Sequence, residues 1–343
     1  MRRRQVLRSS ALFALGGLSS AVLPSCNRSE NPTATTSPAS PTSSSKSPLK
    51  IGLIPWIGWG TVEIAAQKGY FKEVGTEVEQ TVFQTVSDVN TALLAKKVDL
   101  AWLVALDLLV LSAQIPDLKF IYASDYSGNV DAIVGVGINS AADLKGKTLA
   151  REDIPYEVVF TGKYLESLGL KEQDVNIVSL PVPDASAAFI AGKVDAATLY
   201  EPFVGKALKE RAGAKVLYTA KDSNVIINGL AGSAQILQER RDDILAYLKA
   251  IEKASTFQKE NPSEAHAILA KWAGITPDEI TAQMKQIVLM DAAANKNTAF
   301  NDTAPLNVAN SIDAAGPILQ RTGKITKTLA GKDLIDGSFV QAL

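Results

Sequence analysis

Tryptophan, tyrosine and acidic residues recur together where this chain could hold a small molecule. Trp56 and Trp59 flank Gly58 after a strand-like segment, and Asp125 and Glu201 follow later ones. An indole face attracts a desolvated cation with about 2 kcal/mol, and a carboxylate can accept from both arms of a planar N–H donor. The pattern favours a site for a small nitrogen-rich ligand of the guanidinium, urea or amine kind. The predicted ligand-binding residues are Trp56, Trp59, Trp102, Asp107, Asp125, Tyr126, Asp153, Tyr156, Glu157, Tyr200 and Glu201.

Some of these residues also have an ordinary structural interpretation. Trp102 lies inside an apolar run, which is typical of a core residue. Asp107 stands where a helix would begin, although it could also face a cleft. Asp125 and Asp131 could serve only to cap turns. These structural alternatives stay open from the sequence.

An acidic stretch at the start of a predicted helix bears on the charge of the ligand. Glu152, Asp153 and Glu157 stand near the first turn of a helix expected over residues 155–168. Carboxylates there are ordinary partners of the helix dipole, but they would also repel an anion in the same cleft. Arg151 precedes them and keeps a small anion, such as an alkyl sulfonate, nitrate or bicarbonate, open as the alternative.

The chain offers few residues for catalysis or metal binding. It has one cysteine and one histidine, His266, which lies on a predicted C-terminal helix far along the chain from the candidate site. A disulfide framework or a cysteine-rich zinc site needs more of these residues. We therefore predict a binding protein rather than an enzyme, with no catalytic residue, no metal and no cofactor.

Composition indicates a globular body of two domains. The chain has 343 residues, of which 46% are hydrophobic and 21% charged, and a domain usually takes about 150 residues. The formal net charge is -1, but the first 26 positions hold four of the 35 basic residues and no acidic one. The rest is mildly acidic and lacks the basic surface that nucleic acids require, so nucleic acid is an unsuitable partner.

The N-terminal residues have the pattern of an export signal. Residues 1–26 combine a basic start, an apolar run at 11–23 and a small-residue end, which is the layout of an export signal. Arg3 and Arg4 resemble the twin-arginine pattern, and Cys26 resembles the lipidated cysteine of bacterial lipoproteins, although Pro24 departs from it. Residues 27–48 form a tether in which 15 of 22 residues are Ser, Thr or Pro. We expect an exported protein, periplasmic or at the cell surface, with a lipid anchor at Cys26; an ordinary cleaved signal is the alternative.

Strands alternate with helices after the tether. Residues 49–56 are strand-like, 61–71 have helical spacing and 76–83 alternate like a strand, which makes a β-α-β unit. A similar unit opens at 146–150, with a helix at 155–168 and a strand at 175–180.

A repeat indicates that the two units belong to two similar lobes. The segments 88–101 and 184–197 share seven of 14 residues, and each ends a helix at Lys-Val-Asp before a buried strand. We predict an α/β fold with lobe 1 at 49–134 plus 228–343, lobe 2 at 135–227, and crossings near 132–137 and 225–232. Ligands bind at the carboxyl ends of strands in such sheets, so the site should lie in the cleft between the lobes.

The order and spacing of several short motifs resemble one known family. These motifs are Pro55-Trp56-Ile57-Gly58, Ala66-Gln67-Lys68-Gly69-Tyr70-Phe71, Val98-Asp99, Asp143-Leu144-Lys145-Gly146-Lys147, Val194-Asp195 and Tyr200-Glu201-Pro202-Phe203. Together they are similar to the substrate-binding proteins of ABC importers of the nitrate, sulfonate, taurine and bicarbonate type. The resemblance implies a two-lobe type II periplasmic-binding fold with a hinge, a small-molecule ligand and a membrane permease as partners, and we expect a monomer. A ligand sensor and a pyrimidine-precursor binding protein are further alternatives.

Overall fold

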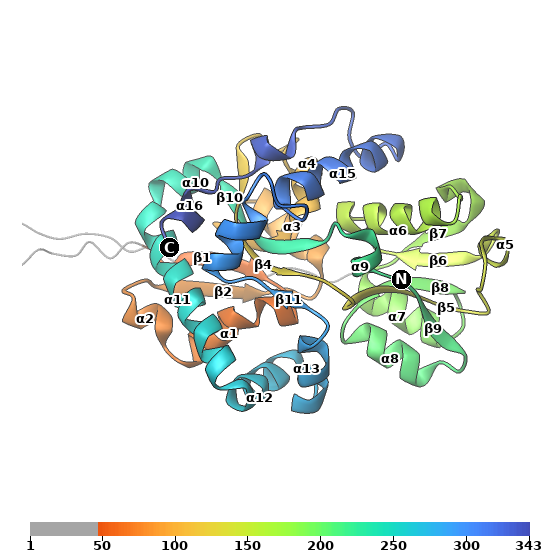
Figure 1. The fold of residues 1–343 in the computed structure, drawn as a ribbon, viewed down its shortest axis with the longest axis horizontal. Helices are drawn as coiled ribbons and strands as arrows, with labels where there is room; N and C mark the ends of the chain where they lie inside the picture. The colour runs from red at the N-terminus through yellow and green to blue at the C-terminus, as the bar shows by residue number, and fades with distance from the viewer. Residues whose placement is uncertain (1–46) are drawn as a thin grey trace, which may run out of the picture. The chain divides into compact units, whose positions relative to one another are not determined.

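The structure is a computed structural model that describes residues 47–343. The predicted export signal, Cys26 and nearly all of the tether lie outside the described residues. From Ser47 onward the chain forms one compact unit with two β-sheets (Figure 1).

The first sheet has six strands in the order β11-β4-β10-β3-β1-β2. Strand β1 runs parallel to β2 and β3, whereas β10 runs antiparallel to β3 and β4. The strands are β1 (Leu49–Leu53), β2 (Val78–Val82), β3 (Leu100–Val104), β4 (Leu118–Tyr126), β10 (Ile227–Ser233) and β11 (Val288–Leu289).

The second sheet repeats this arrangement with five strands in the order β7-β6-β8-β5-β9. Strand β6 runs parallel to β7 and β8, and β5 runs antiparallel to β8 and β9. The strands are β5 (Asp131–Val136), β6 (Thr148–Arg151), β7 (Asn176–Ser179), β8 (Ala196–Tyr200) and β9 (Ala214–Thr219). The match of order and direction confirms the predicted two-lobe α/β architecture.

The Val-Asp pairs of the repeat have the same structural task in both halves. The Asp99 carboxylate accepts a hydrogen bond of 2.9 Å from the backbone N–H of Lys50, and Asp195 accepts one of 2.9 Å from Thr148. Val98 and Val194 are both buried. Each aspartate thus fastens the last parallel strand of its sheet to the first one, which explains the repeat by structure rather than by ligand binding.

The chain changes sheets a few residues before each predicted crossing. It leaves the first sheet after Tyr126 and enters the second at Asp131, and it returns between Thr219 and Ile227. The predicted crossings at 132–137 and 225–232 mostly lie inside β5 and β10 instead. These stretches are apolar because they form strands with a neighbour on each side, not because they form a hinge. The exact lobe boundaries remain a prediction.

Helices cover the sheets and link them. In the first lobe, α11 packs on α1 and α12, while α15 also packs on α6 of the second lobe. Thr276 and Glu279 form the predicted capping box, and Pro262 is the first residue of its helix, as predicted.

The first-lobe helices are α1 (Gly60–Gln67), α2 (Tyr70–Glu73), α3 (Val86–Leu94), α4 (Leu108–Leu111), α10 (Ala234–Glu239), α11 (Arg241–Glu260), α12 (Pro262–Ala273), α13 (Pro277–Met284), α14 (Ala292–Ala294), α15 (Val308–Arg321) and α16 (Ser338–Gln341). Second-lobe helices are α5 (Ala141–Leu144), α6 (Pro155–Ser167), α7 (Val182–Ile190), α8 (Phe203–Glu210) and α9 (Ala220–Ser223). Short helical turns are η1 (Ile57–Trp59), η2 (Ala105–Asp107), η3 (Glu172–Asp174), η4 (Asn295–Ala299) and η5 (Gly331–Leu334).

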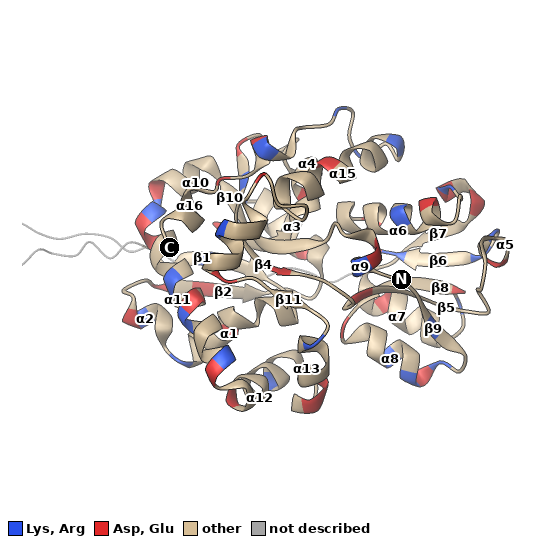
Figure 2. Cartoon of the chain, viewed as in Figure 1, with Lys and Arg blue, Asp and Glu red and all other residues tan. Residues whose placement is uncertain are grey.

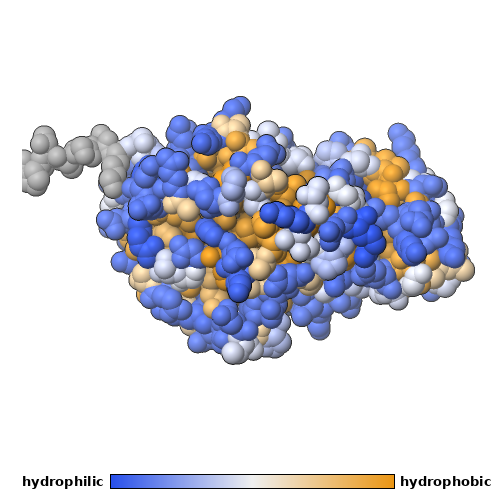
Figure 3. Space-filling view, turned by 90° about the horizontal axis from the view of Figure 1, so that it is seen from above, coloured by the Kyte–Doolittle hydropathy of each residue, from blue (hydrophilic) through white to orange (hydrophobic). Residues whose placement is uncertain are grey.

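Charged residues of both signs lie on the outer helices of both lobes (Figure 2). Hydrophilic residues predominate on the face seen in Figure 3, with smaller apolar areas between them. Across residues 47–343, none of the helices combines the length and the apolar character needed to cross a bilayer.

Candidate functional site

A small cavity lies where the strand ends of the two lobes meet. The space open to the centre of a water molecule is about 20 Å³, which is enough for about one water. A larger solute does not fit this space as it stands. The cavity is lined by Ile54, Trp56, Trp59, Val86, Val104, Asp131, Tyr156, Tyr200 and Asn228.

Strand register explains why the polar residues of this cavity come together. Asn228 lies beside Val104 in the first sheet, and Asp131 lies beside Tyr200 in the second. Val104 and Tyr200 end parallel strands, whereas Asn228 and Asp131 stand at or near the start of antiparallel ones, so each pair lies at the carboxyl end of the parallel strands of its own sheet. That edge is where α/β sheets bind ligands.

Aromatic rings from both lobes form the walls. Trp56 of the first lobe and Tyr200 of the second meet edge to face, with ring centroids 5.8 Å apart. Trp59 lines the same cavity and is almost fully buried. Within residues 47–343 its indole N–H has no hydrogen-bond partner. An unpaired buried donor costs free energy, so this N–H would be stabilised by an acceptor.

Gly58 lets Trp56 and Asp125 approach each other. The indole N–H of Trp56 donates to Oδ1 of Asp125 over 3.3 Å. A Cβ at position 58 would lie 2.0 Å from that oxygen and 2.6 Å from the Trp56 nitrogen. The Trp-Ile-Gly-Trp segment therefore requires glycine at this position.

Asp125 is held in a buried polar network. Its Oδ2 accepts from the Asn228 amide at 2.6 Å, and its Oδ1 accepts from Ser124 at 2.8 Å. Asn228 also donates to Ser127 at 2.9 Å. Burial raises the pKa of Asp125 to about 6, and the bonds from Asn228 and Ser124 limit that rise. Asp125 supports the cavity through Asn228 and Trp56 but does not itself line it.

Asp131 and Asn228 contribute polar atoms to the cavity wall. Asp131 is only 5% exposed, and burial raises its pKa to about 7. The sequence analysis left open whether Asp131 faces the site or only caps a turn, and it passed over Asn228. The signal for Asn228 was available, since it is the one polar side chain in the otherwise apolar run 225–232.

The start of α6 brings acidic residues of both lobes together. Oδ1 of Asp107 accepts from the backbone N–H of Tyr156 at 3.0 Å, and its Oδ2 accepts from Asn90 at 3.1 Å. Asp107 is fully buried, and that burial raises its pKa to about 7. Ser87 of the first lobe also donates to Glu152 of the second. These contacts join the lobes beside the cavity.

Glu157 is buried behind Tyr156. Its Oε2 accepts from the backbone N–H of Glu152 at 2.6 Å, and its Oε1 accepts from the Tyr156 hydroxyl at 3.2 Å. Burial raises the pKa of Glu157 well above its ordinary value, and the nearby Glu152 adds to the rise. Glu157 therefore positions the ring of Tyr156, which lines the cavity.

The other predicted site residues lie away from the cavity wall. Trp102 is fully buried and donates to the Tyr247 hydroxyl at 2.8 Å, so its structural interpretation applies. The Tyr126 hydroxyl donates to the Ala220 carbonyl at 3.0 Å. Asp153 is half exposed and pairs with Lys324 at 2.5 Å, which holds its pKa below the usual value. Glu201 accepts from the backbone N–H of Gly205 at 3.1 Å.

His266 has a structural environment on α12. Its Nδ1 lies 2.8 Å from the Thr281 hydroxyl of α13, and partial burial lowers its pKa. It belongs to the packing of these two helices.

The sequence profile of the NMT1/THI5-like family matches residues 60–265, more than half of the chain. The chain belongs to this family. A protein of Bacillus subtilis (strain 168), provisionally named an aliphatic sulfonates-binding protein, is 26% identical over 81% of this chain and 83% of its own.

Two solved structures share the fold. The periplasmic aliphatic sulphonate binding protein SsuA from Escherichia coli has a TM-score of 0.70 at 20% identity, over 85% of this chain and 92% of its own. The periplasmic nitrate-binding protein NrtA from Synechocystis PCC 6803 has a TM-score of 0.62 at 15% identity, over 81% and 82%. The family resemblance and the two-lobe fold expected from the sequence are thereby confirmed. The names of these proteins agree better with the alternative of an anionic ligand than with the nitrogen-rich ligand predicted first.

Proposed function

We propose that this NMT1/THI5-like protein is the exported solute-binding component of an ABC importer. It captures one small solute in the cavity between its lobes and delivers it to a membrane permease. The observation that carries this proposal is the cavity itself, because it is lined by residues at the strand ends of both lobes, where a single solute would contact both. A ligand that contacts both lobes favours closure, since only the closed form offers all of its contacts.

We propose a small organic anion of the sulfonate type as the first candidate solute. The printed names of the relatives and structural neighbours support it. The unpartnered N–H of Trp59 offers a donor for an anionic oxygen, and Trp56, Ile54 and Val104 offer apolar surface for an alkyl chain.

A nitrogen-bearing solute is the second candidate, and a specific observation favours it. Asp131 lines the cavity, and Asp107, Asp125 and Glu157 are all buried nearby. Carboxyl groups attract N–H donors and, when ionised, repel anions. A guanidinium, urea or amine group would donate to Asp131, and the carbonyl oxygen of a urea would also accept from Trp59.

Calorimetric titration of the exported protein separates the two candidates. The anion panel is ethanesulfonate, taurine, nitrate and bicarbonate, and the second panel is guanidine, urea and agmatine. Trp59→Phe keeps the ring but removes the N–H, and it should weaken binding of the anion about tenfold. Asp131→Asn should weaken only a nitrogen-bearing solute. Binding of the second panel alone would reject the anion, and no response to either panel would reject both.

We also propose that the protein binds its solute without transforming it. The cavity is lined by aromatic, apolar, carboxyl and amide side chains, and His266 lies elsewhere. Recovery of the titrated solute unchanged supports this proposal, whereas a new product would contradict it. A monomeric state, a ligand-sensor role and a pyrimidine-precursor ligand remain predictions.

The lipid anchor at Cys26 is a prediction as well. If a Cys26→Ser protein still fractionates with membranes, that result would contradict the lipid anchor.

A further inference from the structure

A carboxyl group of the chain itself occupies the first turn of α6. This helix begins at Pro155, which has no N–H, so Tyr156 carries the first backbone donor of the helix. That donor is taken by Oδ1 of Asp107 at 3.0 Å. Asp107 comes from η2 of the other lobe, 49 residues earlier in the chain.

The side chain of Asp107 is held in a fixed position by its surroundings. The side chain is fully buried, and its second oxygen is fixed by Asn90 of α3 at 3.1 Å. The first turn of a helix favours negative charge, because its N–H groups and the helix dipole both point toward it. Asp107 therefore makes the interaction that an anionic group of a solute would otherwise make at this turn.

The cavity beside this turn has a second, independent feature that indicates a ligand, which is a buried N–H group without a partner. Tyr156 lines the cavity together with Trp59, and the Trp59 N–H lacks a partner within the described part of the chain. A solute in this cavity therefore lies beside Tyr156, the residue whose backbone N–H is held by Asp107. To use that N–H as well, the solute must displace Asp107.

We propose that Asp107 is a specificity-determining residue that competes, as a carboxyl group of the chain, with anionic solutes for the first turn of α6. Asp107 weakens the binding of small anions, and its own carboxyl group makes the contact between the lobes that an anion would otherwise make. The inference rests on the proposed capture of a solute between the lobes. It holds whether the natural solute is an anion that displaces Asp107 or a nitrogen-bearing compound that leaves it in position.

The test compares three variants of the exported protein with ethanesulfonate as the probe. Asp107→Ala frees the Tyr156 N–H and should tighten ethanesulfonate binding about tenfold or more. Asp107→Asn keeps a side-chain oxygen without the charge and should fall between Asp107→Ala and the unmodified protein. Asp184→Ala is the matched control, since it removes one exposed negative charge from the first turn of α7 and should leave the affinity unchanged.

Hydrogen exchange of the Tyr156 amide provides a readout that does not depend on a ligand. The exchange should become about tenfold faster in Asp107→Ala, because the amide loses its acceptor, and should not change in Asp184→Ala. Val159 and Phe160 in the middle of α6 should keep their protection in both variants. If Asp107→Ala does not fold, as judged by its melting transition, the Asp107→Asn protein takes its place in both measurements.

The outcomes separate this inference from the proposed function. Tight ethanesulfonate binding by the unmodified protein that is unchanged in Asp107→Ala, with unchanged exchange of Tyr156, would overturn the inference and leave the function standing. No binding by the unmodified protein but binding by Asp107→Ala would support the inference and reject the sulfonate as the natural solute.

Discussion

At the scale of single residues, the cavity depends on groups that never touch a ligand. Asp125 does not line the cavity, yet it accepts from both Trp56 and Asn228, which do. Gly58 has no side chain, yet its missing Cβ provides the space for that contact. Such residues hold the cavity-lining side chains in place, and the sequence alone does not distinguish them from ligand contacts.

We expect Gly58→Ala to damage both stability and solute binding. The added Cβ would lie 2.0 Å from Asp125 and must push it or Trp56 aside, which should cost about 1–3 kcal/mol of unfolding free energy. Denaturant unfolding and titration measure the two effects. Gly205→Ala is the control, because in helix α8 the nearest atom is 3.2 Å away on the flexible end of Glu201. Unchanged binding by Gly58→Ala would mean that Trp56 does not form part of the site.

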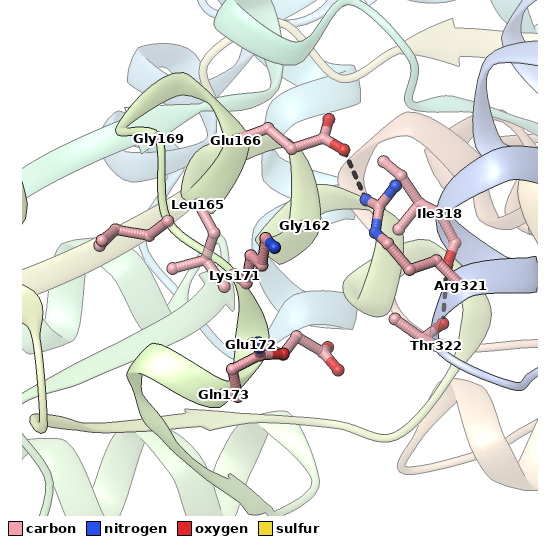
Figure 4. Close-up of a pocket in the computed structure, with 11 residues that line it drawn as sticks. Gly162, Leu165, Glu166, Gly169, Lys171, Glu172, Gln173, Ile318, Arg321 and Thr322 are labelled. Atoms are coloured by element: carbon pink, nitrogen blue, oxygen red, sulfur yellow. Dashed lines mark hydrogen bonds and ion pairs between the residues drawn. The ribbon is translucent and has the colours of Figure 1, made fainter.

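At the scale of elements, α15 and α6 join the lobes on one side of the cavity. A hollow of about 430 Å³ lies between these helices (Figure 4). Across it Arg321 pairs with Glu166 at 2.5 Å. Ile318 packs against Gly162, where a Cβ would meet it at 2.8 Å. Close packing and an ion pair therefore both connect the helices, but they differ in strength.

We expect the packing at Gly162 to matter more than the ion pair. Gly162→Ala should weaken solute binding because the added methyl group pushes α15 from α6, although alanine normally stabilises a helix by about 1 kcal/mol. Glu166→Gln should change the unfolding free energy by less than about 1 kcal/mol, since both partners are about half exposed. Titration and denaturant unfolding of the two variants provide the measurement. A larger effect of Glu166→Gln would show that the charge holds the helices together.

At the scale of the whole molecule, the two lobes bury several carboxyl groups. Burial raises the pKa of Asp107 and Asp131 to about 7 and that of Asp125 to about 6. Repulsion from Glu152 adds to the rise at Asp107, and repulsion from Asp125 and then Glu201 adds to the rise at Asp131. The folded protein therefore keeps these protons to a higher pH than the unfolded chain does.

We expect the melting temperature to fall as the pH rises from about 5.5 to about 8. Groups with a raised pKa contribute their full stability below the ordinary value near 3.8 and lose it as the pH passes through 6 and 7. Exposed acids such as Asp143 and Glu279, whose pKa is lowered, act at lower pH and do not affect this range. Differential scanning calorimetry across the range measures the slope. Asp131→Asn should flatten it, and a melting temperature that rises toward pH 8 would contradict this account.

Local sequence patterns predict most of the architecture of the described chain. The β-α-β units, the capped helices and the repeat at 88–101 and 184–197 all predict elements that the structure contains. These signals are local, because periodicity and capping act over a few residues. The sequence also identified Trp56, Trp59, Tyr156 and Tyr200, which do line the cavity.

Contacts between distant parts of the chain fix which acids face the cavity and which groups they bind. Asp131 meets Tyr200 through strand register, Asn228 meets Asp125 across 103 residues of sequence, and Asp107 reaches α6 from the other lobe. Trp102 became a core residue because its strand lies between two others. Partners so far apart in the chain are set by sheet order and by the contact of the two lobes, and no local pattern of residue types encodes either one.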